Sequence, residues 1–179
     1  MWRTIQTASY CFHDVIAKTK SKKILLLPDA QETTAVPCDV GSPMSVVTQE
    51  FGDLVDSHMV TDEWTSKKGR YGTDAPSLRA RAKALRQWLR ARPESEIVVV
   101  SHGAILDYVV KENLDENGVF KGMLQAVAMF SFASDWSLAG FASGWGNREW
   151  RTYRFDPAEA DECELIEEEE SLQRRRRQS

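Results

Sequence analysis

The stretch Ile97-Val98-Val99-Val100-Ser101-His102-Gly103 decides the fold of this chain. Its four β-branched residues predict a strand that is buried on both faces of a parallel sheet. The apolar pattern from Ala104 to Leu114 then predicts a helix. His102 therefore stands where a strand ends and a helix begins, which is where open parallel sheets bind anions. This stretch alone supports two interpretations equally: His102 binds an anion, or His102 merely ends the strand.

Helical and strand patterns alternate on both sides of this stretch. Helices are predicted over 2–20, 42–55 and 74–92, and further strands over 24–27, 125–133 and 149–155. The third of these helices has one apolar face, and arginines cover the other. Residues 29–43 and 62–74 are rich in turn-forming residues and predict loops. The order of elements predicts an α/β domain with a mostly parallel sheet.

Composition limits the class of protein. The 179 residues, 42% of them hydrophobic, suffice for one domain with a core. A net charge of -4 argues against nucleic acid as a partner, and the absence of a long apolar stretch argues against the membrane. We expect a cytoplasmic protein in which Cys11, Cys38 and Cys163 are reduced. Residues 158–179 form an acidic and then a basic block, and we expect them to be a disordered tail.

Two further motifs add to the histidine. Arg3-Thr4-Ile5-Gln6-Thr7 opens the first helix, and Gln31-Glu32 follows the strand over 24–27. Together with Ser101-His102-Gly103, in this order and spacing, they resemble the histidine phosphatase superfamily, also called phosphoglycerate-mutase-like proteins, in the form common in fungi. The likeness extends over residues 3 to 155.

This resemblance implies both a fold and a chemistry. The fold would be a three-layer α/β/α sandwich, and the reaction would be hydrolysis of phosphomonoesters through a phosphohistidine, without metal or cofactor. Carried over residue by residue, Arg3, His102 and Gly103 would bind phosphate. Glu32 would donate a proton to the leaving oxygen, and His102 would stabilise the transferred group. The partner would be a small phosphorylated molecule or phosphate itself.

The family pattern breaks at its beginning. Family members carry a first strand that ends in Arg-His-Gly and supplies the nucleophile, whereas here the resemblance begins abruptly at Trp2-Arg3. His13 and His58 lack a buried strand before them. We therefore expect residues 1–157 to be a truncated domain in which hydrolysis is impaired. A truncated gene, a natural fragment that needs a partner and a rearranged binding protein all stay open.

Alternative functions follow from the same pocket. The chain would then be a non-catalytic pseudoenzyme that binds an anionic ligand or a partner, or its pocket would serve another acid/base step in a biosynthetic pathway. Whether the chain is an enzyme is thus left open. The sequence specifies neither substrate nor oligomeric state, although the loops 33–45 and 60–75 are expected to shape specificity.

Overall fold

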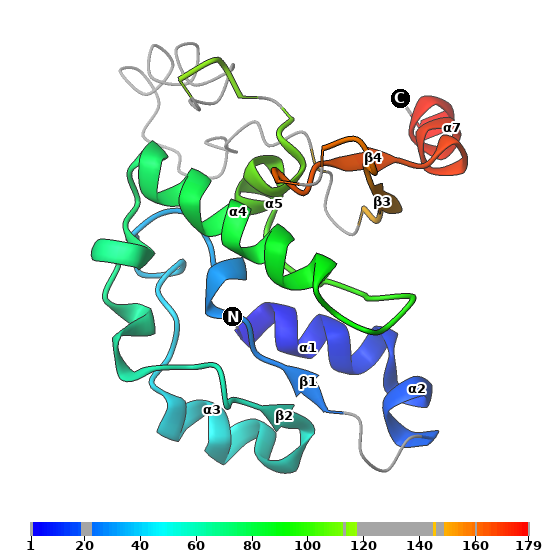
Figure 1. Cartoon of the computed structure of the whole chain (residues 1–179). Coiled ribbons are helices and arrows are strands. Elements are labelled where there is room, and N and C mark those ends of the chain that lie inside the picture. The colour runs from blue at the N-terminus through cyan, green and yellow to red at the C-terminus, as the bar shows by residue number, and fades with distance from the viewer. Residues whose placement is uncertain are drawn as a thin grey trace, which may run out of the picture.

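The computed structural model describes residues 2–18, 23–112, 114–117, 145, 149–159 and 161–178 (Figure 1). The helices are α1 (Trp2–Cys11), α2 (His13–Lys18), α3 (Met44–Phe51), α4 (Ala75–Arg90), α5 (Gly103–Val110) and α7 (Glu169–Gln178). The strands are β1 (Ile24–Leu25), β2 (Val55–Asp56), β3 (Tyr153–Phe155) and β4 (Leu165–Glu167). Short helical turns lie at η1 (Pro28–Ala30), η2 (Gly52–Leu54), η3 (Asp62–Thr65) and η4 (Gly69–Tyr71). Helices and strands thus combine in an α/β fold, as predicted.

Two strand pairs are present in the described residues. β1 and β2 are parallel, with Ile24 opposite Val55, and β3 and β4 form an antiparallel pair. The sequence predicted a helix through Val55, but α3 ends earlier because Gly52 takes a positive φ of 46°. Glycine adopts such backbone angles readily, and the chain therefore turns into a strand beside β1.

The predicted strand over 97–100 pairs with no other strand among the described residues. Val98 is 63% exposed, whereas Val99 packs against the core between α4 and α5. A β-strand is defined by backbone hydrogen bonds to a neighbouring strand, and no described segment forms such bonds with residues 97–100. The predicted strand over 125–133 lies outside the described residues.

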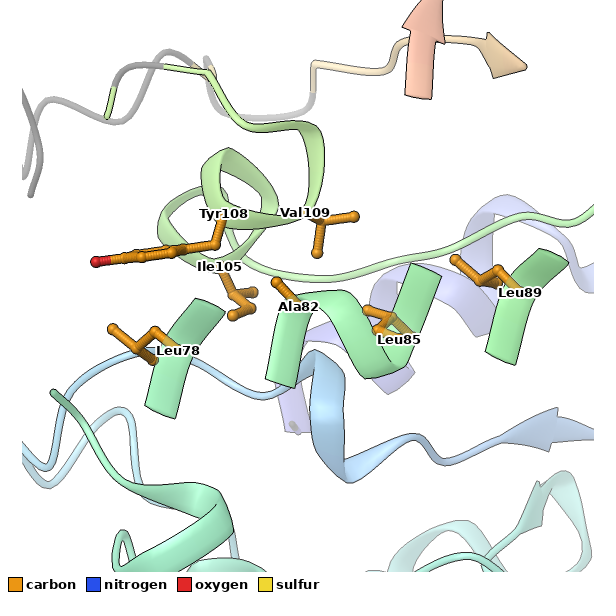
Figure 2. Close-up of a cluster of buried hydrophobic side chains, with 7 residues drawn as sticks. All are labelled: Leu78, Ala82, Leu85, Leu89, Ile105, Tyr108 and Val109. Carbon is orange, nitrogen blue, oxygen red and sulfur yellow. The ribbon is translucent and has the colours of Figure 1, made fainter. Parts of the chain in front are cut away.

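The main core joins α4 to α5. Asp74 caps α4 by accepting a hydrogen bond from the Ser77 amide, 3.0 Å away. Figure 2 shows the side chains that then meet between the two helices, namely Leu78, Ala82, Leu85 and Leu89 from α4 with Ile105, Tyr108 and Val109 from α5. The predicted apolar face of this helix is therefore confirmed.

The prediction that arginines only cover the outer face of α4 is wrong for two of them. Arg81 and Arg86 are buried. Arg86 donates to the carbonyls of Val109 and Glu162, while Arg81 reaches the loop after β1. A guanidinium has five N–H donors, and backbone carbonyls at helix and loop ends offer matching acceptors. α4 therefore holds segments on two sides of the molecule (Figure 1).

Part of the range 158–179 has regular structure. β4 and α7 lie there, although the sequence led us to expect no order after Pro157. Phe155 and Leu165 from the β3–β4 pair pack against the α4–α5 core, which explains their placement. The acidic and basic residues also form ion pairs with each other, including Arg175 with Glu167.

Two further observations concern the chain as a whole. No helix in the described residues has both the length and the apolar character needed to cross a bilayer. Cys11, Cys38 and Cys163 form no disulfide in the structure; the first two are exposed and Cys163 is buried.

Candidate functional site

The site lies where the start of α5 meets the loop after β1. Ser101 Oγ donates to the carbonyl of Ala30 at 2.6 Å, which ties the two segments together. His102 follows as the N-cap of α5 in an extended conformation, and its side chain does not cap the helix. The imidazole is therefore available to face Glu32.

Glu32 and His102 form the centre of the site. His102 Nδ1 lies 3.6 Å from Glu32 Oε2, and the two side chains are 9% and 14% exposed. The other carboxyl oxygen, Oε1, accepts a hydrogen bond from the Thr33 amide at 2.9 Å. The loop thus holds one oxygen of the carboxyl and leaves the second facing the imidazole.

Burial favours the uncharged forms of both groups. It raises the pKa of Glu32, against the opposing effect of the Thr33 hydrogen bond. It also lowers the pKa of His102 to about 4, and the positive charges of Arg3 and Lys67 add to this. The sequence suggested an imidazole that titrates near neutral pH. The lowered pKa instead favours a neutral imidazole near neutral pH, and a neutral imidazole donates through one nitrogen only.

The other expected phosphate-binding residues are Arg3 and Gly103. Arg3 is exposed in the first turn of α1, and its effect on the pKa of His102 puts its charge within electrostatic reach. Gly103 is the first residue of α5. The first amides of a helix have no acceptor within it, so this helix end presents donors and a positive dipole end. The structure thus places Arg3, Glu32, His102 and Gly103 in one region.

The remaining histidines lie elsewhere. His13 is exposed on α2 beside Asp14, and His58 is exposed after β2, where its Nδ1 lies 2.8 Å from Asp56 Oδ1. Neither histidine forms a hydrogen bond or ion pair with Glu32 or His102, although His58 lines the same cavity as His102.

A second layer of contacts, which the sequence did not reveal, fixes the backbone of Gln31 and Glu32. Arg81 Nη2 donates to the Gln31 carbonyl at 2.9 Å, and Lys67 Nζ donates to the Glu32 carbonyl at 2.8 Å. The Gln31 side chain donates in turn to the Trp64 carbonyl at 2.8 Å. Lys67 and Lys68 stand side by side in the sequence, and no sequence signal distinguishes the inward lysine from the outward one.

The loop after Glu32 packs against a buried indole. Trp64 is 1% exposed, and a Cβ atom added at Gly41 would lie 1.7 Å from Trp64 Cη2. Within this loop Thr34 Oγ1 donates to Asp39 Oδ2. The negative charge of Asp39 raises the pKa of both Glu32 and Lys67, so this carboxylate belongs to the electrostatic surroundings of the site.

His102 and Gln31 also line a larger cavity of about 1100 Å³. Most of its other lining is apolar and comes from α1, β1, β2 and residues 96–100. The site therefore combines a small polar centre with an apolar wall.

Taken together, the fold and the site define a class of protein, namely an α/β protein with a buried carboxyl–imidazole pair at the N-terminus of a helix. The model of the histidine phosphatase superfamily (branch 1) matches residues 1–125, and the chain belongs to this superfamily. The resemblance predicted from the motifs is thereby confirmed, and the matched range contains Arg3, Glu32, Lys67 and His102. No curated protein and no solved structure matches the chain.

Proposed function

We propose that this chain binds the phosphate group of a small phosphorylated molecule between His102, Arg3 and the start of α5. The chemistry of the pocket would be that of phosphomonoester hydrolysis. The contact of 3.6 Å between the buried Glu32 carboxyl and the His102 imidazole carries this proposal. A three-layer α/β/α arrangement around this pocket is part of the same proposal.

Each group has a role that its surroundings support. A carboxyl whose pKa is raised retains its proton to higher pH, so Glu32 is suited to protonate the oxygen that leaves phosphorus. The neutral imidazole of His102 donates one N–H to a phosphate oxygen, and a bound dianion would favour its protonated form. Arg3 supplies a guanidinium, whose forked N–H groups match phosphate oxygens.

Hydrolysis through a phosphohistidine needs one more group. A nucleophilic nitrogen must form a bond to phosphorus while the P–O bond breaks and the leaving oxygen takes a proton. His13 and His58 are exposed, and each has an aspartate beside it as its partner, Asp14 and Asp56 respectively; His58 lines the same cavity as His102 but forms no hydrogen bond or ion pair with Glu32 or His102. We therefore propose that this chain by itself binds phosphate but turns phosphomonoesters over poorly.

Inorganic phosphate is expected to stabilise the protein against heat by an amount that rises with the logarithm of its concentration above Kd. At a concentration 100 times Kd, binding adds about 2.7 kcal/mol to the free energy of unfolding. His102→Ala should abolish this stabilisation, and His13→Ala, which removes an exposed histidine outside the cavity lining, should retain it. A thermal unfolding series with phosphate checks the result. An equal response in all three proteins would contradict the proposed site.

Hydrolysis of p-nitrophenyl phosphate by the chain is expected not to exceed that of the His102→Ala variant. The positively polarised pocket alone supplies no covalent route, so any residual rate depends on electrostatic stabilisation only. Release of p-nitrophenolate measures the rate directly. Rapid turnover with phosphate trapped on His13 or His58 would contradict this expectation, because it would identify that histidine as a nucleophile.

A second candidate is a non-catalytic pseudoenzyme that uses the same site only for binding. The exposure of His13 and His58 favours this candidate, because neither histidine forms a hydrogen bond or ion pair with Glu32 or His102. In that case phosphate would stabilise the chain as above, and no phosphorylated compound would be consumed. A pocket that performs another acid/base step would instead convert a metabolite without phosphate, by proton transfer between Glu32 and His102.

A further inference from the structure

Lys67 lies in the wall of the site, in the loop between η3 and η4. It takes a left-handed backbone conformation, with φ of 52°, which few residues other than glycine adopt. Its Nζ donates to the Glu32 carbonyl at 2.8 Å, across 35 residues of sequence. The next residue, Lys68, has an extended backbone with φ of -129° and an exposed side chain. The turn at Lys67 thus separates an inward lysine from an outward one.

The ammonium of Lys67 is poorly compensated. Its side chain is partly buried, and no carboxylate forms an ion pair with it in the described residues, where the Glu32 carbonyl is its acceptor. Burial and the charge of Arg81 lower the pKa of Lys67 to about 8, although Asp39 and Glu32 act in the opposite direction. An ammonium has three N–H donors, so two remain beyond the carbonyl.

The same ammonium lies close to the groups assigned to the ligand. Its charge lowers the pKa of His102, and its acceptor belongs to Glu32 itself. An anion between the neutral imidazole of His102 and the guanidinium of Arg3 would therefore meet a second positive charge, that of Lys67, from the opposite loop. Bringing an anion to a partly buried cation that has no direct ion pair recovers part of the free energy that burial costs.

We propose that Lys67 is a ligand-contacting residue, which donates a hydrogen bond to the bound phosphate from the loop between η3 and η4. This proposal rests on the proposed function, because it assigns a further contact to the same phosphate. Lys67 then links specificity to the 60–75 loop, while Arg3 and His102 contact the phosphate from the helix ends.

The test measures binding of inorganic phosphate to the full chain by calorimetry. Lys67→Met is expected to raise Kd by about tenfold or more, since a hydrogen bond between two charged groups is lost. Lys68→Met is the matched control, and it should change Kd by no more than about twofold, because an exposed charge is screened. If the wild type binds phosphate and Lys67→Met binds it equally well, Lys67 is not a ligand contact.

A second measurement uses the unaltered protein and does not depend on how the variant folds. Acetic anhydride labels unprotonated amines, and mass spectrometry reports the labelling of each lysine. Saturating phosphate is expected to protect Lys67 and to leave Lys68 unchanged. Equal labelling of Lys67 with and without phosphate, while calorimetry shows binding, overturns the role of Lys67 and leaves the proposed function intact. Absence of phosphate binding to the wild type overturns both.

Discussion

Trp64→Ala is expected to lower the free energy of unfolding by about 3–5 kcal/mol, the range for removing a large buried aromatic side chain. The indole is 1% exposed and lies directly against the backbone at Gly41. Its removal leaves a cavity beneath the loop that follows Glu32. Denaturant unfolding, followed by circular dichroism, measures the loss.

Trp150→Ala is the matched control for this change. Trp150 is 63% exposed, and its ring lies 3.8 Å from the Arg174 guanidinium carbon. Removing an exposed cation–π contact costs about 1 kcal/mol or less. If both tryptophan variants lost the same small amount of stability, the loop would not depend on Trp64.

Acidification is expected to destabilise the folded chain through His102 by about 3 kcal/mol between pH 7 and pH 4. The pKa of His102 is about 4 in the folded chain, against an ordinary value of 6.5. Between these values the unfolded chain binds more protons than the folded one, so stability falls as the pH falls. Above pH 6.5 the imidazole is mostly neutral in both the folded and the unfolded chain, so His102 no longer makes the stability depend on pH.

Glu32 contributes with the opposite sign. Its pKa is raised in the folded chain, so between its ordinary value of 4.5 and the raised value the folded state binds more protons. Stability from Glu32 therefore increases as the pH falls through that window. A comparison with His102→Asn separates the two effects, since burial still acts on Glu32 in the variant. Parallel stability curves for wild type and variant would contradict the lowered pKa of His102.

Much of the fold followed from local pattern. The apolar face of α4 could be predicted because the leucines recur at helical spacing, and because Asp74 is a typical N-cap residue at the start of that helix. The pairing of the predicted strand over 97–100 could not be predicted in this way. β-branched residues indicate only a preference for extended backbone, and the pairing depends on a neighbouring strand far away in the sequence. The prediction of disorder for residues 158–179 also failed to take distant contacts into account. Charged blocks suggested disorder, while Phe155 and Leu165 determine how the hairpin packs.

Some residues of the candidate site could be predicted from the sequence, and others could not. Glu32 and His102, which the structure brings within 3.6 Å of each other, could be named as candidates because each follows an apolar run within a motif order shared by a family. Lys67 and Arg81 were missed, because their roles depend on the backbone carbonyls they reach and not on neighbouring letters. The pKa of His102 was missed as well. It depends on how deeply the imidazole is buried, which only the folded arrangement determines.

The distribution of the three thiols gives the chain convenient chemical handles. Cys163 is buried, whereas Cys11 and Cys38 are exposed. A maleimide dye is therefore expected to label Cys11 and Cys38 but not Cys163 while the chain is folded. Replacing Cys11 by serine would leave Cys38 as the single accessible attachment point. That position is next to Asp39, in the loop that borders the pocket, and a fluorophore there would report ligand entry as a change in emission.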